Sequence, residues 1–151
     1  MSLTRRIARP LLAAPFISGG IDTLRNPEPR VEMAEPVAPP IAERLPLPDD
    51  TDQLVKVNAA VQVVAGIFLA IGWLPRLAAC DLGGSLVPTT LAGHRFWEKD
   101  DPAQRHQQQI HFVKNVGLLG GLILAAFDTG GAPSVGWQAR RAARRVRKKV
   151  S

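Results

Sequence analysis

The chain has 151 residues, enough for one domain, and a formal net charge of +6 from 19 Lys and Arg against 13 Asp and Glu. Its one cysteine, Cys80, excludes an internal disulfide and a cysteine-built metal site. Seven of the basic residues follow Trp137, and the other 12 nearly balance the acids, so the basic character belongs to a tail. The mean hydropathy is close to zero, so a membrane assignment depends on where the apolar residues lie.

The first apolar stretch, 7–24, reads IARPLLAAPFISGGIDTL and is about as short as a membrane-spanning helix can be. Pro10 fits a first helical turn, whereas Pro15 predicts a kink. Because Arg5 and Arg6 precede this stretch, a cleaved signal peptide is the alternative. Two prolines interrupt the apolar run and no small-x-small cleavage site follows it, which favours a retained span.

An acidic, proline-rich segment, 26–53, follows the first span. Its prolines argue against a regular helix through its centre. Apolar residues such as Val31 and Met33 recur in it, so a free linker is not expected. We predict an ordered or half-ordered loop that rests on the helices, with one short helical turn near 40–44.

Two further apolar stretches follow in close succession. The stretch 57–75 has no charged residue, and helices of soluble proteins rarely stay uncharged on every face for so long. The stretch 77–93 carries Asp81, and Pro88 predicts a kink in it. Both are predicted to span the membrane.

The fourth apolar stretch, 110–127, is rich in glycine. Upstream, Asp101 and Pro102 offer an N-cap and a first-turn proline, so this helix is expected to begin before the span. Gly117 and Gly121 form a GxxxG pair, which permits close approach of another helix. Packing inside the bundle is the preferred interpretation, and homodimerisation is the alternative.

The basic residues give the orientation of the spans. Basic residues precede the first span and follow the fourth. Between the second and third spans, Arg76 lies in the turn. Basic segments prefer the cytoplasmic side, and four spans place all three there together. The prediction is an all-α, four-helix transmembrane bundle in the bacterial inner membrane, with both termini cytoplasmic. Residues 1–131 form the membrane domain and 132–151 a basic cytoplasmic tail.

Three pieces of sequence resemble the DoxX family of small bacterial membrane proteins. They are RPLLAAPFISGGIDTLRNP at 9–27, GHRFWE at 93–98 and QQQIHFVKNVGLLGGLILA at 107–125, of which the last is the most specific. The resemblance implies a four-helix membrane bundle. For some members it also implies quinone-linked thiosulfate oxidation, or thiol and oxidant defence. Many relatives carry a lysine after the glycines of the first helix, and here Asp22 follows them, so no role is carried over from that lysine.

Charged residues inside a membrane are costly and usually paired, so each becomes a functional candidate. Under the predicted topology a polar cluster lies toward the outer leaflet, with Asp22 expected opposite Lys114. The functional interpretation is a site for a quinone headgroup, a small thiol or sulfur anion, or a proton relay. The structural interpretation, which we favour, is an ion pair that pins two helices. The candidate cofactor-binding residues are Asp22, Lys56, His94, Arg95, His111, Lys114 and Asn115.

At the opposite, cytoplasmic side, Asp81 and Asp128 require partners, which Arg9, Arg76 or the tail are expected to supply. Cys80 is interpreted as a packing residue, because the adjacent carboxylate of Asp81 disfavours a reactive thiolate. No metal site is expected: the spacing of the three histidines, His94, His106 and His111, does not place them on one helical face. The tryptophans near the span ends fit an interfacial belt, namely Trp73, Trp97 and Trp137.

The basic tail directly follows the fourth span, which suits binding to the anionic inner leaflet. A nucleic-acid-binding tail would have a similar composition, but attachment to a membrane span favours lipid. The residues predicted to bind lipid are Arg140, Arg141, Arg144, Arg145, Arg147, Lys148 and Lys149.

Three functions remain open at this point. The first is an accessory or scaffold subunit of a membrane-associated redox or envelope complex, with other membrane or envelope proteins as partners and no catalysis of its own. The second is a component of a quinone-linked thiosulfate or thiol oxidoreductase, with quinone as the candidate cofactor. The third is a small transporter or proton-relay protein.

Overall fold

The computed structural model describes residues 3–38 and 50–128. Over these ranges the chain forms five α-helices, one short 3-10 helix and no strand, so the predicted all-α class is confirmed. The predicted turn at 40–44 and the basic tail lie outside the described residues. The elements are α1 (Leu3–Arg25), α2 (Glu28–Ala34), α4 (Thr51–Ile71), α5 (Pro75–Gly93), η1 (Phe96–Glu98) and α6 (Pro102–Ala126).

Each predicted span lies in a helix, but the helix boundaries follow local capping. The helix α1 starts at Leu3, so Pro10 lies inside it and the prediction of a first-turn proline is wrong. The helix α4 starts earlier than 57, because the Asp50 side chain accepts a hydrogen bond from the backbone N–H of Asp52 at 3.0 Å. It ends before 75, because Gly72 adopts a left-handed conformation with φ 78°.

The predicted start of the last helix is confirmed. Asp101 caps α6 by accepting hydrogen bonds from the backbone N–H groups of Ala103 and Gln104, and Pro102 occupies the first helical position. Proline has no backbone N–H group and therefore destabilises the interior of a helix. At the first helical position no intrahelical hydrogen bond is lost.

The acidic segment contains a helix that the prediction did not include. The helix α2 begins directly after Pro27 and carries Pro29 in its first turn, where proline costs no intrahelical hydrogen bond. It packs against α4 and α5, and Met33 reaches the end of α5 at Gly93. The expectation that this segment rests on the helices is met by α2.

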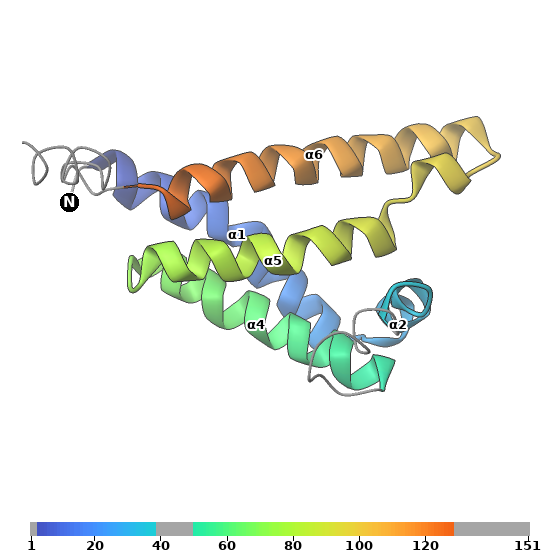
Figure 1. Ribbon diagram of the computed structural model, residues 1–151, viewed down its shortest axis with the longest axis horizontal. Coiled ribbons are helices and arrows are strands. Elements are labelled where there is room, and N and C mark those ends of the chain that lie inside the picture. Colours follow the sequence, from blue (N-terminus) through green and yellow to red (C-terminus); the bar gives the residue numbers. More distant parts are fainter. Residues whose placement is uncertain (1–2, 39–49, 129–151) are drawn as a thin grey trace, which may run out of the picture.

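The long helices pack in sequence order, α1 on α4, α4 on α5 and α5 on α6, whereas α1 and α6 contact each other only weakly. Figure 1 shows the start of α1, the α4–α5 turn and the end of α6 together at one end of the molecule. We call this the terminal end. The helix α2 and the α5–α6 connection lie at the other end, which we call the loop end.

Glycines allow α1 and α4 to run very close together. A Cβ added at Gly20 would stand 2.8 Å from the carbonyl oxygen of Ala59, and one at Gly66 would stand 2.7 Å from a side-chain carbon of Ile17. These pairings also show that the two helices are antiparallel. The predicted GxxxG pair packs inside the bundle at one glycine only: a Cβ added at Gly121 would stand 3.1 Å from Leu12 of α1, whereas nothing lies within 4 Å of a Cβ placed at Gly117.

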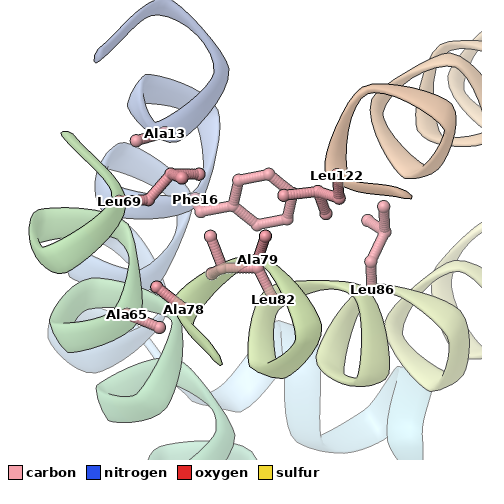
Figure 2. Close-up of a cluster of buried hydrophobic side chains, with 9 residues drawn as sticks. All are labelled: Ala13, Phe16, Ala65, Leu69, Ala78, Ala79, Leu82, Leu86 and Leu122. Atoms are coloured by element: carbon pink, nitrogen blue, oxygen red, sulfur yellow. The ribbon is translucent and has the colours of Figure 1, made fainter. Parts of the chain in front are cut away.

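The buried core is small and lies toward the terminal end (Figure 2). Phe16 of α1 points into the space between the helices, toward Leu122 of α6 and Leu82 of α5. Leu69 is the large side chain that α4 contributes, and the remaining positions are mostly alanines, including Ala65 of α4. Small side chains at these positions let four helices approach without a large core.

The surface of the molecule is unusually apolar. Two helices, α4 and α6, are long and apolar enough to cross a membrane, and only 22% and 11% of their most apolar windows are buried. A core helix of a water-soluble protein would be mostly covered, so these faces are better suited to lipid. Whether α1 and α5 also span the membrane remains a prediction.

Candidate functional site at the loop end

Two histidines from neighbouring helices stack at the loop end. His94 follows the last residue of α5, and His111 lies on α6. Their ring centroids are 5.1 Å apart with an interplanar angle of 19°. The Nδ1 atom of His94 lies 2.7 Å from Oε1 of Gln108, three residues before His111 on the same helix. Because an amide oxygen can only accept a hydrogen bond, Nδ1 carries the proton. Nε2 of the neutral ring then remains a hydrogen-bond acceptor.

The surroundings of His94 favour its neutral form. Partial burial lowers the pKa of His94 below its ordinary value of 6.5, and the nearby charges of His111, Lys114 and Arg30 lower the pKa further. The hydrogen bond with Gln108 acts in the opposite direction. At neutral pH this neutral ring can therefore accept a hydrogen bond at Nε2, as a polar ligand site requires.

The predicted ion pair between Asp22 and Lys114 is wrong. Asp22 instead pairs with Arg30 of α2 at 3.3 Å, because α2 brings this arginine back to the end of α1. Lys114 is exposed on α6 and forms no ion pair with the described residues. It contributes to the histidine pair only through its charge.

The other predicted residues are divided among local contacts. Lys56 pairs with Asp52, four residues earlier on α4, at 2.6 Å. Arg95 pairs with Glu98 at 3.1 Å and donates to the backbone oxygen of Leu91. The structure thus brings His94, His111 and Lys114 together and leaves the remaining candidates outside this group. We call His94, Gln108, His111 and Lys114 the histidine corner.

Asn115 has a different environment, one helical turn further into the bundle. It is buried, and its amide donates a hydrogen bond to the hydroxyl of Thr90 on α5 at 3.0 Å. Thr90 in turn donates to the backbone oxygen of Leu86. Asn115 therefore joins α5 to α6 beneath the histidine corner.

A second polar contact, between α4 and α5, was not predicted. Gln62 donates to the hydroxyl of Ser85 at 2.9 Å, and Ser85 donates to the amide oxygen of Asn58 at 2.8 Å. Asn58 and Gln62 both lie within hydrogen-bonding distance of Thr89. Their spacing is the sequence signal: each pair is four residues apart in an apolar stretch, and so on one helix face. We call Asn58, Gln62, Ser85 and Thr89 the polar seam.

Aromatic residues adjoin the histidine corner in sequence. Phe96 and Trp97 of η1 and Phe112 of α6 make edge-to-face contacts with centroid distances of 5.1 to 6.1 Å. At the terminal end Trp73 packs edge-on against Phe68 at 4.4 Å. Both tryptophans are exposed near helix ends, as an interfacial belt requires. The third predicted member, Trp137, lies outside the described residues.

Asp128, just after α6, contacts arginine side chains, as predicted. Arg9 approaches its carboxylate at 3.4 Å, and Arg76 donates to its backbone oxygen at 2.8 Å. Arg5, which was not among the expected partners, makes the shortest contact with the carboxylate, 2.8 Å. Neither prediction made for α5 is met, since Cys80 is exposed rather than packed and Asp81 has no ion pair within the described ranges.

Among the residues described, no group of three or more His, Cys, Asp or Glu side chains is arranged to hold a metal ion. The histidine corner therefore consists of two stacked imidazoles, one amide and one exposed ammonium group. It offers hydrogen-bond acceptors, donors and positive charge to a small polar ligand.

The sequence model of the DoxX family matches residues 5–95, from the start of α1 to the end of α5. No curated protein and no solved structure matches the chain. The matched region contains the first of the three sequence pieces on which the resemblance was based and the beginning of the second. The glycine-rich piece in α6, judged the most specific, lies outside the match.

Proposed function

Because the chain belongs to the DoxX family, and is thus a small membrane protein, we propose that it crosses the bacterial inner membrane several times. Within that membrane it serves as an accessory or scaffold subunit of a redox or envelope complex.

The arrangement of the helices supports the multi-pass topology. The basic residues at the start of α1 and at the start of α5 lie at the terminal end, where Arg5 and Arg76 both contact Asp128. The helix α2 and the α5–α6 connection lie at the loop end. Four crossings with the terminal end in the cytoplasm agree with the preference of basic segments for that side.

The observation that carries the scaffold role is an unpartnered face of α6. Apolar and glycine residues recur along it at alternating spacings of three and four, the pattern of a helix that packs against another helix. Its large members are strongly exposed, up to 77% for Leu124 and 80% for Phe127. At its centre nothing lies within 4 Å of a Cβ added at Gly117 or Gly120. We call this face the α6 seam; its members are Ile110, Val113, Gly117, Gly120, Leu124 and Phe127.

Glycines at the centre of a heptad-spaced membrane face favour close approach of a second helix, because helices in lipid associate by packing rather than by the hydrophobic effect. The opposite face of α6, which includes the buried Asn115 and Leu122, already packs on α5. The α6 seam is therefore available to a transmembrane helix of a partner subunit.

The test is purification of the full chain from its native membranes in a mild detergent, with quantitative mass spectrometry of the proteins that accompany it. The double variant Gly117→Leu/Gly120→Leu should lose the stoichiometric partner that the wild type retains. Gly84→Leu is the matched control, because Gly84 also has nothing within 4 Å but lies on α5. Recovery of the wild-type chain without any stoichiometric partner would contradict the scaffold role.

A second candidate function is favoured by the histidine corner. Lys114 beside the stacked histidines can donate a hydrogen bond to a quinone oxygen, and Nε2 of a neutral His94 can accept one from the hydroxyl group of the reduced quinol. On this interpretation the protein is the quinone-binding component of a thiosulfate- or thiol-oxidising system.

This alternative is tested in membranes by quinone reduction that depends on added thiosulfate or thiol. His94→Gln and Lys114→Ala should each lower the rate, whereas Lys56→Ala should not, because Lys56 pairs locally with Asp52. Equal rates in all variants would remove the histidine corner from the reaction and leave the scaffold role as the explanation.

A further inference from the structure

Three arginines converge on one acidic residue at the terminal end. The guanidinium groups of Arg5 and Arg9 come from α1, and that of Arg76 comes from the start of α5. All three contact Asp128 after the end of α6. We call these four residues the Asp128 cluster.

The charges of the cluster do not balance. Three guanidinium groups face one carboxylate, and Arg76 binds the backbone oxygen of Asp128 rather than its side chain. The partial negative charge at the C-terminus of α6 compensates only about half a unit. A net positive charge therefore remains beside a side chain, Arg9, that is only 13% exposed.

The arginines also keep most of their hydrogen-bond donors free. Each guanidinium group has five N–H donors, and each uses only one nitrogen toward Asp128. Arg5 and Arg76 both use Nε, so their terminal amino groups have no acceptor among the described residues. The side chain of Arg5 is 26% exposed and Arg76 is exposed, so these donors can be reached from outside.

Exposed apolar side chains adjoin the cluster on two of the elements that contribute to it. Leu77 follows Arg76, and Phe127 precedes Asp128. A ligand at this position would meet guanidinium donors at one level and apolar surface beside them. An anionic phospholipid combines these two properties, whereas a soluble phosphate uses only the first.

We propose that the Asp128 cluster binds the phosphate group of an anionic phospholipid, with the terminal amino groups of Arg5 and Arg76 as its principal donors. The inference rests on the proposed membrane topology, which places this end at the cytoplasmic headgroup level. The arginines of this site are held in place by packed helices and by Asp128.

The experiment uses the full chain, purified in a neutral detergent and titrated with phosphatidylglycerol, phosphatidylcholine or inorganic phosphate. Bound lipid is counted by native mass spectrometry, and thermal unfolding reports stabilisation. The site variant is Arg5→Gln/Arg76→Gln. One control, Arg6→Gln/Arg25→Gln, removes two charges from exposed α1 positions without described partners. The other, Arg140→Gln/Arg141→Gln, removes two charges from the tail.

The wild type should bind phosphatidylglycerol more tightly than phosphatidylcholine, and the site variant should lose about tenfold in affinity, as expected for charge-assisted hydrogen bonds. Each control should change the affinity by less than about twofold. Equal losses in the site variant and a control would show general attraction to positive charge and overturn the proposal. Equal stabilisation by inorganic phosphate would keep the phosphate site but overturn the lipid as its ligand.

If the site variant does not fold, the single variant Arg76→Gln decides the matter, because it removes one of the two principal donors and leaves both arginines that pair with the Asp128 carboxylate. Phosphatidylglycerol binding should then be weakened, and unchanged binding would contradict the proposal. The proposed topology is tested separately by carbonate extraction of membranes. A chain that stays in the membrane without selective lipid binding would refute the site alone, whereas a released chain would refute the topology.

Discussion

Gly20 of α1 lies against Ala59 of α4 so closely that the position of a Cβ would be 2.8 Å from the alanine carbonyl oxygen. On the other helix, α4, a Cβ added at Gly66 would likewise stand too close to an atom of α1. Together they make the α1–α4 pair the tightest packed part of the molecule, and they depend on the absence of two side chains.

Gly20→Ala should therefore destabilise the protein by about 1–3 kcal/mol, the usual cost of overpacking, although alanine is the better helix former. Gly120→Ala is the matched control, because it adds the same methyl group where nothing lies within 4 Å. Unfolding in mixed micelles with increasing denaturing detergent measures both. A stability loss that is equal in the two variants would contradict the packing described here.

The polar seam should couple α4 to α5. In a double-mutant cycle, Gln62→Leu and Ser85→Ala are expected to show a coupling free energy of about 0.6 kcal/mol, and up to about 1.7 kcal/mol, as found for interhelical hydrogen bonds in membranes. The same measurement with Ser18→Ala in place of Ser85→Ala should give no coupling, because Ser18 bonds only to its own helix. Coupling with Ser18 as large as with Ser85 would argue against a specific contact.

His94 should make the stability of the protein dependent on pH. Its folded-state pKa is lowered below 6.5, mainly by burial, so the unfolded chain binds more protons between the two pKa values. Stability is therefore expected to fall as the pH decreases from about 6.5 toward the folded-state pKa. Thermal unfolding between pH 7.5 and 5 measures this effect.

The variant His94→Gln should lose the part of the pH dependence that His94 supplies. His106→Gln is the control, because His106 is exposed near the start of α6. The charged or titratable groups that face His94 are His111, Lys114 and Arg30, and they remain in both variants. An unchanged pH profile in His94→Gln would show that His94 does not cause the dependence.

The sidedness of the two ends can be tested by labelling single cysteines in a Cys80→Ser background. Glu98→Cys at the loop end should react with a membrane-impermeant maleimide in intact spheroplasts, and Thr4→Cys at the terminal end should react only after lysis. Both positions are exposed. Reaction of both from the same side would contradict the proposed topology, since an intact bilayer separates the two ends.

The histidine corner could be predicted only in part. His111 and Lys114 share a helix face by their spacing, and His94 was placed at the same membrane level from the length of its helix. The partner of Asp22 could not be found in this way, because it depends on α2, whose start is set by Pro27 and Pro29 in a segment that looked unsuitable for a helix. The basic partners of Asp128 could be predicted in part, because basic residues recur at those ends of the spans that are predicted to face the cytoplasm.

By itself, the sequence determined where helices form and where they stop. The cap at Asp101, the left-handed turn at Gly72 and the uncharged run of α4 are local features, which depend on neighbours within about four residues. Only the tertiary structure decided which side chains meet: Asp22 with Arg30, Gln62 with Ser85, and Gly20 with Ala59. Such contacts depend on how each helix is rotated and shifted against its neighbour, and packing across the whole bundle sets that geometry.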